Sequence, residues 1–251
     1  MNTLPVSAVV ATCLVLAVLL GTRLRRLLPE HHLAADSKDA VKLAIGLIAT
    51  MTALLLGLLV SSAKGSFDTE RTEVVQMAAK VAFLDRLLTL YGPEAADART
   101  RLHALVEEAV RRMWPEEAGA VAQLQPDEQA GDATYAALQS LSPRDDTQRA
   151  VKAQAMALAV EFGQLRMLLV AQAIPSISPP LLVVVVSWLV IIFLVFSLLA
   201  PPNATTALCL VAAALSVSGA IFLVLELDHP FGGMIRIPSA PMLAVVGRLA
   251  K

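Results

Sequence analysis

Four stretches of the sequence contain no Asp, Glu, Lys or Arg and consist mainly of apolar residues. They are Leu4–Leu20, Leu43–Val60, Pro180–Leu199 and Ala204–Leu225, each 17 to 22 residues long. A helix needs about 20 such residues to cross the hydrocarbon core of a bilayer. Because lipid cannot hydrogen-bond to the backbone, each stretch is predicted to form a transmembrane helix. The expected fold is therefore all-α and polytopic, with four transmembrane helices.

The composition agrees with a membrane location. Of the 251 residues, 57% are hydrophobic, and the mean hydropathy is +0.68, which is unusual for a soluble domain. The lipid bilayer is therefore a predicted partner. The first apolar stretch is preceded by Met1–Thr3, which has no Lys or Arg, and the basic residues follow it. That order is typical of a membrane anchor and not of a cleaved signal peptide.

The sequence has no pattern for catalysis, metal binding or nucleic-acid binding. With a formal net charge of -1 and no basic stripe outside the membrane flanks, no nucleic-acid partner is expected. There is no Gly-rich phosphate loop, His-Glu-x-x-His motif or nucleophile elbow, so the protein is predicted not to be an enzyme. Cys13 and Cys209 lie in apolar stretches without zinc or redox spacing, and no cofactor or metal is predicted.

Charged residues concentrate between the second and third apolar stretches. Residues 64–178 hold 12 Lys and Arg against 16 Asp and Glu, which predicts an acidic extramembrane domain. The predicted organisation is a first transmembrane hairpin with a basic linker (1–62), an amphipathic helical domain (63–178), a second hairpin (179–228), and a Pro-Phe-Gly-Gly turn with a tail (229–251).

Apolar residues at three- and four-residue steps predict the helices of the acidic domain. One helix is expected to continue the second apolar stretch through Phe67–Tyr91, with Val74, Val75 and Met77 opening its buried stripe. The remaining expectations are a helix over Glu94–Met113, a loop over Gly119–Gly131, a short helix over Asp132–Leu141, and a long helix that begins at Ser142 and runs toward Ile174.

Basic residues beside the apolar stretches bear on orientation. The linker Gly21–Lys42 has a dense cluster at Arg23–Arg26 directly after the first stretch. Because Lys and Arg beside a span are retained in the cytoplasm, this cluster predicts a non-cytoplasmic N-terminus and helical domain. Arg236, Arg248 and Lys251 follow the fourth stretch and favour the opposite orientation by a comparable count.

The strongest candidate for a functional cluster lies at the end of the fourth stretch. Glu226, Asp228 and His229 are followed there by a Pro-Phe-Gly-Gly turn. Ionisable groups at this depth are costly unless they are paired or face water. One hypothesis is a ring of charges at a pore mouth, or a docking point for Arg166 or Lys42. The other hypothesis is that the acids only mark the membrane interface.

Small and hydroxyl residues recur within the apolar stretches. Thr50, Ser187, Ser216 and Gly219 are the candidates for lining a pore or for close packing between helices. Such residues let transmembrane helices approach closely and share hydrogen bonds. Both roles remain open on this pattern alone.

The C-terminal third resembles the bestrophin-like family of bacterial membrane proteins. This family is defined by a domain whose function is unknown. The resemblance covers about Leu165 to Met242 and rests on Pro180–Val183, Trp188, Ile191–Phe193, Phe196–Leu198, Ala200–Asn203, Ala214–Val217, Ala220–Leu223, Glu226–Asp228, Pro230–Gly233, Met234–Ile237 and Ser239–Pro241. The N-terminal half is similar in layout: two apolar stretches, a basic linker, and a helix that extends beyond the second stretch.

The resemblance implies a channel-like protein of the bacterial inner membrane. Bestrophins are pentameric anion channels whose transmembrane and cytoplasmic helices enclose one axial pore. The expected function is therefore a homo-oligomer that conducts small ions, with anions implied by the resemblance, through a pore between subunits. The alternative is a non-conducting scaffold or signalling protein whose acidic helical domain binds a partner protein. The chain lacks the aromatic-rich neck motif and acidic calcium-ligand cluster of bestrophins.

Overall fold

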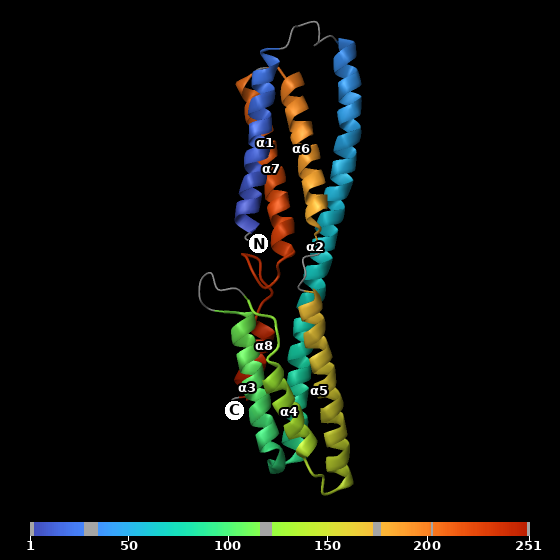
Figure 1. Ribbon diagram of the computed structural model, residues 1–251, viewed down its shortest axis with the longest axis vertical. Helices are drawn as coiled ribbons and strands as arrows, with labels where there is room; N and C mark the ends of the chain where they lie inside the picture. Colours follow the sequence, from blue (N-terminus) through green and yellow to red (C-terminus); the bar gives the residue numbers. More distant parts are fainter. Residues whose placement is uncertain (1–2, 28–34, 116–121, 173–176, 202, 250–251) are drawn as a thin grey trace. The chain divides into compact units, whose positions relative to one another are not determined.

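The computed structural model describes residues 3–27, 35–115, 122–172, 177–201 and 203–249, and within these ranges the regular structure is helical. The elements are α1 (Thr3–Arg25), α2 (Ala35–Tyr91), the short 3-10 helix η2 (Pro93–Ala95), α3 (Ala96–Met113), α4 (Glu128–Ser140), α5 (Asp146–Gln172), α6 (Pro179–Leu199), α7 (Ala204–Leu227) and α8 (Ala240–Leu249). Figure 1 labels the α-helices. The predicted all-α class is confirmed.

The four apolar stretches fall within α1, α2, α6 and α7. Among the described residues, however, five helices are long and apolar enough to cross a membrane, and the fifth is α5. This helix carries Arg149, Lys152, Glu161 and Arg166, charges that are costly in hydrocarbon. The number of membrane spans therefore stays a prediction.

The chain divides into two compact units. The first unit comprises residues 1–66 and 176–228, and the second comprises residues 67–175 and 229–251. The helix α2 contributes its first part to the first unit and its second part to the second unit. The prediction that one helix continues the second apolar stretch to Tyr91 is confirmed.

In the first unit, α1 packs against both α6 and α7 (Figure 1). Its buried residues recur at three- and four-residue steps and are Thr3, Ser7, Val10, Leu14, Ala17, Val18 and Gly21. Gly21 is the tightest point, because a Cβ atom added there would lie 2.6 Å from the carbonyl oxygen of Leu194 and 2.6 Å from Cβ of Ser197. A residue without a side chain is therefore needed for α1 and α6 to approach at this depth.

The core of the second unit lies between its part of α2 and the helices α3, α4 and α5. The predicted stripe of α2 is buried at Val74 and Met77, but Val75 is exposed. Val75 points away from the buried side, because it lies about 100° around the helix from Val74 and about 160° from Met77. The helix α3 buries apolar residues at three- and four-residue steps, among them Leu102, Leu105, Val106, Val110 and Met113.

Two helix starts differ from the prediction because side chains cap the helices at other residues. The helix α4 begins at Glu128, inside the predicted loop, since Asp127 Oδ1 accepts a hydrogen bond from the Ala130 N–H at 3.0 Å. The helix α5 begins at Asp146 instead of following Ser142, since Asp145 Oδ1 accepts from the Gln148 N–H at 2.7 Å. Such caps satisfy N–H groups that have no partner within the helix.

The C-terminal tail contains a helix that the sequence analysis did not predict. This helix, α8, buries Met242, Val245 and Leu249 and contacts α3. In the segment just before α8, the Ile237 carbonyl accepts a hydrogen bond from the Trp114 indole N–H at 2.9 Å. Residues 229–249 thus pack on the helices of the second unit.

We expect Gly21→Ala to destabilise the protein, because the added methyl group must push the α6 backbone away. The expected loss is about 1–3 kcal/mol, the usual cost of overpacking. Gly46→Ala is the matched control, because nothing lies within 4 Å of a Cβ atom at that position. Thermal unfolding in detergent should show a lower midpoint for Gly21→Ala and an unchanged or higher midpoint for Gly46→Ala. Equal midpoints would contradict a tight contact between α1 and α6.

Candidate functional site

Glu226, the central residue of the predicted cluster, is completely buried in the first unit. Its carboxylate oxygen Oε1 accepts a hydrogen bond from the hydroxyl group of Thr3. Thr3 is the first residue of α1, and Glu226 lies in the last turn of α7. The carboxylate therefore joins the start of one helix to the end of another, and this placement favours a role in packing.

The other members of the predicted cluster are divided between the two units. Asp228 is nearly buried at the C-terminal end of α7, and His229 belongs to the second unit. Arg166 lies on the buried face of α5 in the second unit. Lys42 is exposed and pairs with Asp39 on its own helix at 2.9 Å. Whether any of these residues lies at a pore mouth stays a prediction.

The candidate pore-lining and packing residues all lie on the exposed surface of the single chain. Thr50, Ser187, Ser216 and Gly219 are each exposed. Each hydroxyl group donates to a carbonyl of its own helix, Thr50 to Gly46 at 2.9 Å, Ser187 to Val184 at 2.8 Å and Ser216 to Ala212 at 2.9 Å. These hydroxyl groups can therefore face lipid, a pore or another subunit without an unsatisfied donor.

Arg25 has a structural role that the sequence analysis missed. It was considered only as part of the basic cluster that bears on orientation. Its guanidinium donates to the carbonyl of Ala200 and, at 3.5 Å, to that of Leu198. These carbonyls end α6, where a cation satisfies free acceptors and interacts favourably with the helix dipole. Arg23 and Arg26, by contrast, are exposed.

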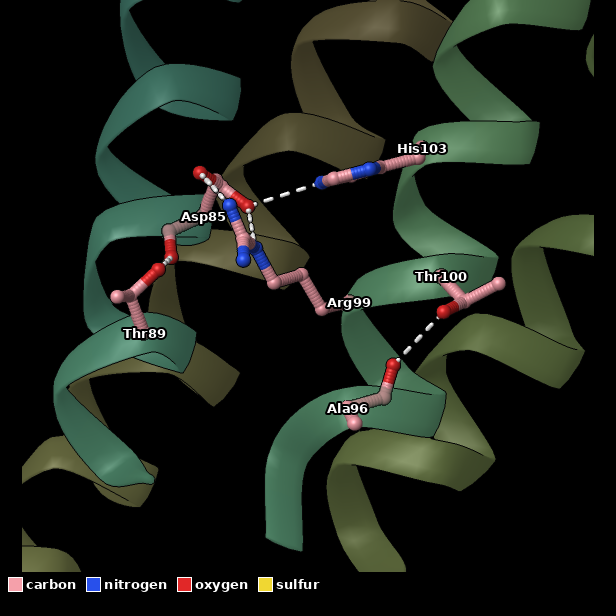
Figure 2. A network of polar contacts seen from close by, with 6 residues as sticks. All are labelled: Asp85, Thr89, Ala96, Arg99, Thr100 and His103. Atoms are coloured by element: carbon pink, nitrogen blue, oxygen red, sulfur yellow. Dashed lines mark hydrogen bonds and ion pairs between the residues drawn. The ribbon is translucent and has the colours of Figure 1, made fainter. Parts of the chain in front are cut away.

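A polar network in the second unit joins α2 to α3. Figure 2 shows the hydrogen bonds that Asp85 forms with Arg99 and His103 of α3. Arg99 Nε lies 2.6 Å and His103 Nε2 lies 2.9 Å from Asp85 Oδ1. Arg99 Nη2 also reaches Asp85 Oδ2 at 3.3 Å, so the guanidinium binds both carboxylate oxygens. Burial alone would raise the pKa of Asp85, but the hydrogen bonds and charges of Arg99 and His103 outweigh it and lower that pKa.

Two buried carboxylates of α2 were also missed. Glu70 and Glu73 lie on the buried side of the helix in the second unit, next to Val74. Burial raises the pKa of Glu73, and a hydrogen bond with Gln172 opposes part of this rise. The sequence did contain a sign of their burial: Glu70 and Glu73 are three residues apart, on the same helix face as the apolar stripe.

Comparison with known proteins places the chain in a family. The helices define an α-helical membrane protein, and a model of the Bestrophin-like domain matches residues 12–242. The chain belongs to the Bestrophin-like family. The expected family is thus confirmed, and the match extends through the N-terminal half as well.

A solved structure shares the fold. The chain is similar to a bacterial bestrophin homologue from Klebsiella pneumoniae, crystallised with a single substitution, at a TM-score of 0.68 and 17% sequence identity. The similarity covers 95% of this chain and 97% of that chain. A search of curated proteins found no match.

We expect Thr3→Val to destabilise the protein, because it removes the hydroxyl group that pairs with the buried Glu226 carboxylate. Loss of one hydrogen bond to a charged group costs about 1.5–3 kcal/mol. Thr12→Val is the matched control, since Thr12 is exposed on the same helix and bonds only to the Ala8 carbonyl at 2.7 Å. The measurement is thermal unfolding in detergent. If both variants unfold at the same temperature, the link between α1 and α7 contributes nothing to stability.

We expect Asp85→Asn to destabilise the second unit in a pH-dependent way. A carboxyl group with a lowered pKa stabilises the fold above its unfolded value, 3.8 for Asp, and this contribution disappears as the pH falls through the folded value. The difference from the unaltered protein should be about 1 kcal/mol at neutral pH, allowing for solvent screening, and should vanish in acid.

Asp97→Asn is the control for this network, because Asp97 pairs with Arg101 on an exposed helix surface. Thermal unfolding of the three proteins at pH 7 and pH 3 gives the comparison. A loss for Asp85→Asn that is equally large at both values would show that the carboxylate charge is not what stabilises this contact.

Proposed function

We propose that the protein is a homo-oligomeric channel of the bacterial inner membrane that passes small ions through an axial pore between subunits. Membership of the Bestrophin-like family and the fold shared with a bacterial bestrophin homologue support a channel-like protein. Bestrophins are anion channels, and we extend anion conduction to this chain by analogy.

The observation that carries the proposal is an exposed face of α2 in the first unit. Its members recur at three- and four-residue steps and are Leu43, Leu47, Thr50, Leu54, Gly57 and Ser61, all exposed. We call this set the outer face of α2. The opposite side is buried at Ile45, Thr52 and Leu59. The outer face is free of charge and interleaves large apolar residues with Thr, Gly and Ser, the residue types that line pores and subunit contacts.

If the subunits form a ring, the outer face of α2 can line a central pore. The helix α1 fills the space beside α6 and α7 with its own buried side chains, so a path through that packed bundle would have to displace them. Closed cyclic symmetry instead places the same face of every subunit around one axis. The outer face of α2 would then surround the axis as a ring of helices.

We expect the purified protein to show single-channel current steps in planar bilayers containing chloride salts. Light scattering on the same sample should give a mass several times that of one chain. Electrical silence in several salts, with oligomers intact, would overturn conduction. Silence combined with crosslinking to a different protein would favour the alternative, a scaffold whose acidic second unit binds a partner.

A cysteine scan tests whether α2 lines the pore. In a background with Cys13→Ala and Cys209→Ala, we expect a charged thiol reagent to reduce the conductance of Thr50→Cys. Ser216→Cys is the matched control, because it is equally an exposed hydroxyl residue, but on α7. Block of Ser216→Cys without block of Thr50→Cys would place α7, and not α2, at the conduction path.

A further inference from the structure

The second unit contains a cavity of about 430 Å³ between α2, α3, α4 and α5. Its walls are mainly apolar and include Leu84 of α2, Leu102 of α3, Leu138 of α4 and Phe162 of α5. Three of these side chains are almost wholly buried, at 1–2% exposure. A concave apolar site of this volume, with few polar groups, is typical of sites for small organic molecules.

A buried cation, Arg166, lines this cavity. Only 8% of its surface is exposed, and its Nε atom is fully enclosed without a hydrogen-bond partner among the described residues. Burial lowers the pKa of Arg166, the charge of Arg112 adds to this effect, and Asp127 opposes it. An enclosed N–H donor without a partner on a charged group is costly, and an anion in the cavity would offset that cost.

Asp127, the acid whose charge acts on Arg166, is already engaged by other groups. Asp127 Oδ1 accepts the hydrogen bond that caps α4, from the Ala130 N–H at 3.0 Å. Asp127 Oδ2 accepts from Arg112 Nη2 at 3.3 Å. No ion pair with Arg166 occurs in the described ranges, so its donors are available to a bound molecule.

We propose that this cavity binds a small organic monocarboxylate with an apolar body. The carboxylate would accept hydrogen bonds from the Arg166 guanidinium, whose planar fork matches two carboxylate oxygens. The apolar body would lie against Leu84, Leu102 and Phe162. This role is independent of conduction, because every residue involved belongs to the second unit.

The lining also selects against other anions. Asp127, Glu128 and Asp132 line the cavity together with Arg166, and Glu128 and Asp132 are exposed, where solvent screens their charges. These acids oppose a single negative charge weakly and repel ligands that carry several negative charges more strongly. A simple inorganic anion would leave the apolar walls without a partner and would lose its hydration shell in the cavity. One negative charge on an apolar body therefore fits the lining best.

The test measures binding of 3-phenylpropionate to the full-length protein in nanodiscs by titration calorimetry. The uncharged 3-phenylpropanol is the matched ligand without the carboxylate, and empty nanodiscs correct for partitioning into lipid. We expect the carboxylate to bind at least tenfold more tightly than the alcohol. Equal affinities, or no binding of the carboxylate at millimolar concentration, would overturn the proposal.

Two variants separate the charge from the cavity. Arg166→Met should weaken binding of 3-phenylpropionate by about 10- to 100-fold, the usual effect of losing a hydrogen bond to a charged group. Gly163→Leu should also abolish binding, because Gly163 lines the cavity and an added Cβ atom would meet nothing within 4 Å. That variant keeps Arg166 and fills the space instead.

Arg149→Met is the control for the loss of a positive charge, since Arg149 is exposed on the same helix. It should bind 3-phenylpropionate as the unaltered protein does. Thermal unfolding without ligand checks the fold of each variant, and Arg166→Met should be no less stable, because it removes an unpaired buried charge. Unchanged affinity in a folded Arg166→Met protein would overturn the role of this guanidinium.

Discussion

The cost of leaving a polar group unpaired away from water is the constraint on which the rest of this structure depends. In the first unit, the long helices pair their own backbone N–H and C=O groups. Side chains form hydrogen bonds with the polar groups that the helices leave unpaired. Thr3 pairs with the buried carboxylate of Glu226, and Arg25 binds the carbonyl of Ala200 at the end of α6. In the second unit, Arg99 and His103 satisfy Asp85 in the same way.

Local pattern was enough to predict most of the helices, because helix formation and burial of a stripe depend on residues three and four apart. The extension of α2 to Tyr91 and the buried side of α3 follow from such stripes. The starts of α4 and α5 could not be predicted in this way. Asp127 and Asp145 cap these helices, but other residues nearby in the chain are equally suitable as caps. Local sequence does not rank such competitors.

The candidate site was less predictable, because its contacts join residues far apart in the sequence. Thr3 and Glu226 are separated by 223 positions, and nothing near either residue indicates the other. Gly21 could be recognised as important only once α6 was seen beside it. Arg166 was considered as a docking partner for the acids at the end of the fourth stretch, and nothing in the local sequence indicated that it lines a cavity in the second unit.

The engagement of Glu226 by Thr3 also constrains how the proposed channel would select ions. The Glu226 carboxylate is wholly buried in the single chain and bonded to Thr3, so a pore along the outer face of α2 would be lined by uncharged side chains. Whether Glu226 lies at a pore mouth stays a prediction. The outer face of α2 presents Leu47, Thr50 and Leu54 and carries no charge between Leu43 and Ser61. A pore lined in this way discriminates by the free energy of dehydrating an ion at an apolar constriction, with the Thr50 hydroxyl as the nearest polar contact. Weakly hydrated ions would then pass more readily than strongly hydrated ones.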